Sequence, residues 1–121
     1  MKNFYEQIGE ERLHNVIKEF YQLVFSSPII SHLFENDKQL IQDKQIKFLT
    51  QFLGGPDLYS QEYGHPKMRM RHLPHKIDQP AKEEWLRCMN EAIRKVFHDD
   101  IVLGSSFYAI FPPIANHMVN S

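Results

Sequence analysis

Three histidines lie close together in the middle of the chain, and their chemistry stands out first: His65, His72 and His75. A histidine with an ordinary pKa of about 6.5 is mostly a neutral imidazole in the cytosol, and this is the form that binds iron or zinc. A zinc site would need more ligands, yet the segment has no cysteine, no obvious carboxylate partner and no familiar zinc spacing. Composition and spacing leave His72 as either a metal ligand or an ordinary polar residue at a helix end.

Basic residues alternate with methionines beside these histidines. Lys67, Arg69 and Arg71 could contact a phosphate, but three cations in a chain with 14 basic and 15 acidic residues are more often a solvated rim. The net charge of −1 provides no overall field that would attract nucleic acid or an anionic membrane surface. We also find no glycine-rich phosphate loop, nucleophile elbow or paired-carboxylate motif, so the sequence does not favour a hydrolase.

Three hydrogen-bond donors lie at or beside apolar helix faces: Tyr21, Gln45 and Trp85. Each has an ordinary structural explanation, since a helix tyrosine packs its ring, most glutamines point outward and a tryptophan anchors a core. Together with Phe34 and His72, they are also the residues that a pocket for a large flat cofactor between helices would need.

Helices must position these residues, because apolar residues recur at spacings of three and four and no run alternates with a period of two. The pattern predicts a long helix over residues 13–24, a short turn or two over 29–34, and a second long helix over 38–53 that Gly54, Gly55 and Pro56 end. The sequence therefore predicts an all-α fold.

The second half of the chain is less regular. Residues 57–77 show no sustained period, although Pro66 can open a short helix that reaches about His72. Asp78 and Pro80 make a helix start for a third long helix that continues to Val96. Residues 100–119 are apolar enough for a core helix but contain prolines 112 and 113, which predict a kink or two short helices.

The totals fit one domain over residues 1–121. Cys88 is the single cysteine, so no disulfide framework is expected and a reducing compartment suits the chain. The first 19 residues carry charges throughout, and no stretch approaches the length of a membrane span. We therefore expect a cytoplasmic protein.

Several stretches in a fixed order resemble the group II truncated haemoglobins. They are FLTQFLGGPDLY at residues 48–59, GHPKMRMRHLP at 64–74, WLRCM at 85–89 and HMVN at 117–120, with Phe20 and Tyr21 ahead of them. The combined spacing is highly specific and covers nearly the whole chain. The resemblance implies an all-α truncated globin, in which two helices are stacked over two others around haem b.

The resemblance also implies which residues act on a gas. The histidine of the RMRH stretch is the proximal iron ligand in that family, and here it is His72. On the opposite, distal face, Tyr21, Gln45 and Trp85 would donate hydrogen bonds to bound oxygen, which carries partial negative charge on ferrous haem. The implied function is high-affinity binding or storage of oxygen, with carbon monoxide and nitric oxide as further gas ligands.

Five other residues are implied as haem contacts. Phe34 would pack on the haem, Ile41 would form the distal gate and Lys44 would lie near a haem propionate. Tyr59 and Arg71 match positions near the haem edge and the propionates.

The chain departs from the family pattern at three places. His75 stands where phenylalanine is usual, Gly9 is followed by Glu10 where many relatives have two glycines, and the prolines at 112 and 113 are unexpected in the final helix. His75 would place a titratable group near the haem edge and leave the iron bond untouched, whereas the other two departures concern the packing more than the chemistry.

Two other functions stay open at this stage. One is an enzyme that uses bound oxygen or peroxide, as a nitric oxide dioxygenase or a peroxidase does, and it would need an external reductase as partner. The other is a helical adaptor or basic-patch module without haem. The sequence does not separate a monomer from a homodimer.

Overall fold

The computed structural model describes residues 3–34, 37–64 and 78–119, and within these ranges all regular secondary structure is helical. The elements are α1 (Phe4–Ile8), α2 (Glu10–Ser26), the 3-10 helix η1 (Ser31–Phe34), α3 (Lys38–Phe52), α4 (Leu58–Tyr63), α6 (Gln79–Val96), α7 (Ile101–Tyr108) and α8 (Phe111–Met118). The all-α prediction is confirmed. The short helix predicted to reach His72 lies outside the described residues.

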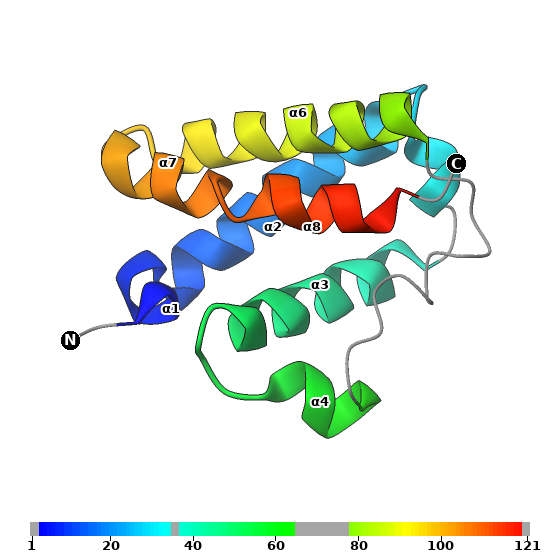
Figure 1. Cartoon of the computed structure of the whole chain (residues 1–121). Coiled ribbons are helices and arrows are strands. Elements are labelled where there is room, and N and C mark those ends of the chain that lie inside the picture. Colours follow the sequence, from blue (N-terminus) through cyan, green and yellow to red (C-terminus); the bar gives the residue numbers. More distant parts are fainter. Residues whose placement is uncertain (1–2, 35–36, 65–77, 120–121) are drawn as a thin grey trace.

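Two pairs of helices form the layers of the molecule. Figure 1 shows α6 and α8 side by side in one layer and α3 with α4 in the other, while α2 crosses behind them. The packing contacts agree, since α2 packs on both α3 and α6, and α6 packs on α8. None of the helices that the structure describes is both long and apolar enough to cross a membrane.

Aspartates define the starts of three helices. The side chain of Asp37 accepts backbone N–H groups of α3, Asp78 accepts the Ala81 N–H of α6 at 3.0 Å, and Asp100 accepts the Leu103 N–H of α7 at 3.2 Å. Such caps satisfy amides that have no partner inside the helix, and each stabilises its helix by about 1 kcal/mol. The predicted helix start at Asp78 is confirmed.

The proline pair divides the last segment into two short helices, as predicted. Helix α7 ends at Tyr108, and α8 begins at Phe111 with the prolines in its first turn. Proline is tolerated there because first-turn amides have no acceptor within the helix. The prolines therefore start a helix and do not bend one.

The sequence analysis found no periodic pattern over residues 57–77 and predicted no helix at the start of this segment. The structure has helix α4 there. Its six residues are too few to show a period, and contacts with α3 hold it in place. The Gln51 side chain both donates to Ser60 Oγ at 2.8 Å and accepts the Ser60 backbone N–H at 2.9 Å. Lys47 of α3 also pairs with Glu62.

A single glycine makes the turn between α1 and α2. Gly9 has φ of 84°, in the left-handed region that favours glycine, and Glu10 is already the first residue of α2. One glycine is therefore sufficient for this turn. Glu10 and Glu11 place negative charge at the positive end of the α2 dipole, which stabilises the helix.

The core lies where α2 meets α6, with α7 and α8 closing it. Its largest fully buried side chains include Phe20, Phe97, Phe107 and Phe111. Burying one such ring stabilises the fold by roughly 2–3 kcal/mol. The most extensive helix packing is the α2–α6 interface.

Candidate functional site

An aromatic cluster joins α2 to α6. The ring centre of Phe20 lies 4.8 Å from that of Tyr21 and 5.1 Å from that of Trp85, both in edge-to-face geometry. Trp85 also packs against Phe111 of α8 at 5.8 Å. Tyr21 and Trp85, distant in the sequence, therefore share one fully buried neighbour.

Phe34 of η1 belongs to the same cluster. Its ring lies edge-on to Tyr21, with 5.9 Å between the ring centres, and Phe25 contacts the same tyrosine at 5.4 Å. The structure thus brings together Tyr21, Phe34 and Trp85, three residues that the sequence singled out.

The polar atoms of the predicted donors have no acceptor within residues 3–34, 37–64 and 78–119. There the Tyr21 hydroxyl, the Trp85 indole N–H and the Gln45 amide make no hydrogen bond to a side chain or to a carbonyl group. No side-chain nitrogen or oxygen atom among those residues is both fully buried and unpaired, so none of the three donor groups is completely enclosed by the protein.

Burial strengthens the preference of Tyr21 for its protonated form. The side chain is only 3% exposed, and burial raises the pKa of its phenol above the ordinary value because the charged phenolate would lose its hydration. The hydroxyl therefore carries its proton at neutral pH and can act as a donor.

Helix α3 carries the other predicted contacts. Every residue over 41–48 is half-buried, and Ile41 packs against the core cluster. Lys44 places its Nζ 5.0 Å from the ring centre of Tyr63. Gln45 lies on the same helix.

Tyr59 of α4 is buried against α3, with its ring 5.9 Å from that of Phe48 and 5.1 Å from that of Tyr63. The assignments of Ile41, Lys44 and Tyr59 to a cofactor stay predictions.

Several candidate residues lie outside the described part of the chain. They are His65, Lys67, Arg69, Arg71, His72 and His75. The predicted iron ligand and the alternative zinc set both fall there. Among the residues that are described, no group of three or more histidine, cysteine, aspartate or glutamate side chains is placed to hold a metal.

Sequence reasoning missed a buried polar link between α2 and α6. Ser27 Oγ donates a hydrogen bond of 2.5 Å to Glu84 Oε2, while Arg87 donates to Glu84 Oε1 at 2.5 Å and to Oε2 at 3.0 Å. Glu84 is the residue before Trp85. It could have been noticed because it falls on the same helix face as Ala81 and Cys88, where a charge is unusual.

These hydrogen bonds determine the charge of Glu84. The Arg87 guanidinium, and after it the Ser27 hydroxyl, hold the pKa of the Glu84 carboxyl below its ordinary value. The carboxylate is therefore ionised at neutral pH and accepts from both residues.

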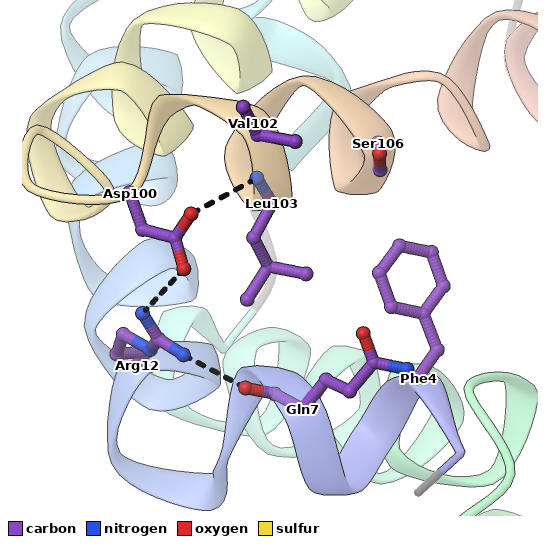
Figure 2. A pocket seen from close by; sticks show the side chains of 7 residues that line it. All are labelled: Phe4, Gln7, Arg12, Asp100, Val102, Leu103 and Ser106. Atoms are coloured by element: carbon purple, nitrogen blue, oxygen red, sulfur yellow. Dashed lines mark hydrogen bonds and ion pairs between the residues drawn. The ribbon is translucent and has the colours of Figure 1, made fainter. Parts of the chain in front are cut away.

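A separate groove of about 720 Å³ opens where α1, the start of α2 and α7 meet. Figure 2 shows Arg12 between Gln7 and Asp100, with Phe4 and Leu103 on the groove walls. The Arg12 guanidinium donates to the Gln7 carbonyl at 2.7 Å and to that of Ile8 at 2.8 Å.

Arg12 also lies 4.6 Å from the Phe97 ring centre and 4.0 Å from an Asp100 carboxylate oxygen. Its donors are engaged in joining helix ends, so its role is structural. Tyr21 lies nine residues further along α2, about 13 Å along the helix axis, so the groove is distinct from the aromatic cluster.

Comparison with known proteins gives a consistent result. The sequence profile of the bacterial-like globins matches residues 3–120. The chain is 41% identical over 116 residues to the group 2 truncated hemoglobin YjbI of Bacillus subtilis. The aligned region covers 96% of this chain and 87% of that protein.

Solved structures agree with the sequence matches. The truncated oxygen-avid haemoglobin from Bacillus subtilis superposes with a TM-score of 0.91 at 39% identity, covering 98% of this chain and all of that one. The group II truncated haemoglobin from Bacillus anthracis superposes with a TM-score of 0.93 at 36% identity, covering 100% of this chain and 98% of the other.

Proposed function

Because this chain belongs to the bacterial-like globins and, among them, to the group II truncated haemoglobins, we propose that it holds haem b and binds oxygen with high affinity. The observation that carries the proposal is the pair of donors on the Phe20 ring. Tyr21 and Trp85 contact this ring from α2 and α6, and neither has a hydrogen-bond acceptor among the described residues.

The side chains that are described suit a flat and mostly apolar macrocycle. Phe34, Ile41 and Phe48 are half-buried hydrophobic residues at the edge of the core. This is expected where a bound cofactor would bury the remaining exposed surface of such side chains. Lys44 provides a cation close by for a carboxylate group. We assign the iron-ligand role to the imidazole of His72 and a propionate contact to Arg71, on the basis of the RMRH stretch.

The protein's own contribution is a set of oriented donors. Haem iron, when bound, supplies the coordination position for a diatomic gas such as oxygen, carbon monoxide or nitric oxide. Tyr21, Trp85 and Gln45 donate hydrogen bonds toward negative charge on the gas, and in a dry site such bonds are stronger than in water. Slow release follows, which suits storage better than bulk delivery.

A spectrum tests the proposal directly. We expect purified protein to show the absorbance bands of a haem protein and to shift when reduced and exposed to carbon monoxide. His72→Gly should lose the pigment or its ferrous spectrum, and free imidazole should restore both. His98→Gly, which removes an exposed histidine in the turn after α6, should leave the spectrum unchanged. A His72→Gly protein with the parent spectrum and no added imidazole would refute the assignment.

A further inference from the structure

We propose that the Ser27–Glu84–Arg87 link sets the relative position of the two donors Tyr21 and Trp85. Ser27 and Glu84 are then positioning residues for the gas site, since they act through the helices that carry the donors. This inference rests on the proposed function.

The link joins the segments that carry the donors. Ser27 follows the last turn of α2, six residues after Tyr21, and Glu84 directly precedes Trp85 in α6. Ser27 and Glu84 are 4% and 8% exposed as whole residues, so their hydrogen bond is largely shielded from water. A hydrogen bond to a charged acceptor in such a place is stronger than one between neutral groups.

The carboxylate is oriented from both sides. One of its oxygens accepts from Ser27 and Arg87, and the other accepts from Arg87 alone. Arg87 also donates to Glu91 at 2.7 Å, one turn further along α6. With its donors in this arrangement, the carboxylate has little freedom to rotate, and it connects the turn of α6 that carries Trp85 to the end of α2.

Ser27 has a second connection. Its Oγ accepts the backbone N–H of Ile29 at 3.3 Å, at the turn that leads into η1. Phe34 at the end of η1 contacts Tyr21. One hydroxyl therefore connects α6 to the end of α2 and to the turn before a third member of the aromatic cluster.

The Trp85 ring itself is held only by apolar contacts among the described residues. It lies against Phe20 and Phe111, and ring contacts of this kind tolerate sliding more than hydrogen bonds do. The direction of the indole N–H therefore depends on where α6 places the Trp85 backbone.

A purely stabilising role makes a different prediction, and the chain offers a matched control. Lys95 of α6 pairs with Glu19 of α2 at 2.9 Å, so it also connects these two helices, but its side chain is 69% exposed. If any α2–α6 link sufficed, Lys95→Ala and Ser27→Ala would have similar effects on the gas site.

The experiment uses the haem-loaded full chain with three variants: Ser27→Ala, Glu84→Gln and Lys95→Ala. Trp85 is the only tryptophan, so a nitrogen-15 spectrum of the diamagnetic carbon monoxide complex contains one indole signal. That signal reports on the ring whether or not it donates to the gas. Oxygen dissociation is measured by stopped flow on the same samples. Ser27→Ala keeps the Glu84–Arg87 pair, so it should fold.

We expect Ser27→Ala and Glu84→Gln to shift or broaden the indole signal and to speed oxygen dissociation by roughly 3- to 10-fold. Lys95→Ala should leave the signal in place and the rate within about 1.5-fold of the parent. An unmoved indole signal in Ser27→Ala, or an equal shift in Lys95→Ala, overturns the positioning role. A shifted signal with an unchanged oxygen rate supports positioning and instead contradicts the proposed donor role of Trp85.

Discussion

Removing the two donors while keeping an aromatic ring at each position is the most informative perturbation of the gas site. Tyr21→Phe deletes one oxygen atom and keeps the ring contacts with Phe20, Phe25 and Phe34. The hydroxyl has no acceptor among the described residues, so we expect the free energy of unfolding to change by less than about 1 kcal/mol. Trp85→Phe also loses part of a half-buried ring and should cost about 1–2 kcal/mol of stability.

The effect on oxygen release should be much larger than the effect on stability. A hydrogen bond to a charged group contributes about 1.5–3 kcal/mol, so losing both should speed dissociation by roughly a hundredfold to ten-thousandfold. Because both rings contact Phe20, the effects of the two single substitutions on oxygen release should not be strictly additive. Both single variants and the double variant therefore have to be measured.

The assay is stopped-flow displacement of oxygen by excess carbon monoxide, at fixed pH and temperature. Tyr5→Phe is the matched control, since it removes the same atom from a half-buried tyrosine of α1. We expect it to release oxygen at the parent rate. A double variant within about threefold of the parent would mean that neither side chain reaches the gas, and the donor roles of Tyr21 and Trp85 would have to be abandoned.

Three further outcomes follow from the structure. Ile41→Ala should change the rates of gas entry and exit together and leave the affinity nearly unchanged, because an apolar side chain offers no hydrogen bond; unequal changes measured by flash photolysis would contradict the gate assignment. Arg12→Ala should lower the free energy of unfolding by about 1–3 kcal/mol without altering the haem spectrum. It leaves two carbonyl groups without their donor and removes a cation–ring contact at the junction of α1, α2 and α7. Burial raises the pKa of Cys88 to about 11, so between pH 9 and 11 the unfolded chain loses its thiol proton first. The native state then holds the extra proton, and stability should fall by up to about 1.4 kcal/mol per pH unit in this range. Urea titrations should show a shallower fall for Cys88→Ala, and equal slopes would exclude this cause.

The three long helices could be predicted from the sequence, with the bounds of α3 and α6 closer than those of α2, which extends beyond the predicted residues 13–24 at both ends. The spacing of apolar residues locates α2, α3 and α6, and the aspartate before Pro80 marks the start of α6 correctly. Each of these features is local, because a helix face and a cap are encoded within a few residues. The resemblance to a family added the topology, which periodicity alone does not contain.

Features that depend on tertiary contact could not be predicted in this way. Helix α4 is only six residues long, and the Gln51 side chain of α3 satisfies the Ser60 backbone N–H near its start. Propensity alone does not form a helix of this length. The Ser27–Glu84 hydrogen bond joins residues 57 positions apart, and no local pattern pairs them.

The roles assigned to the candidate site residues stay predictions. Tyr21, Phe34 and Trp85 lie in one aromatic cluster, although Tyr21 and Trp85 each had an ordinary structural explanation. What distinguishes them is the lack of an acceptor for the two donors, and this is visible only when neighbouring helices are in place.

The long separation between α2 and α6 has a consequence for how the molecule is made. Because α6, one of the two long helices that pack on α2, is encoded some sixty residues downstream, a growing chain on the ribosome carries the α6-facing part of the α2 apolar face uncovered until most of the sequence has emerged. The wall around Trp85 also needs Phe111, so it is complete only near the end of synthesis. Pigment uptake should therefore follow release of the nascent polypeptide, and nascent chains stalled before α8 should bind chaperones and remain colourless.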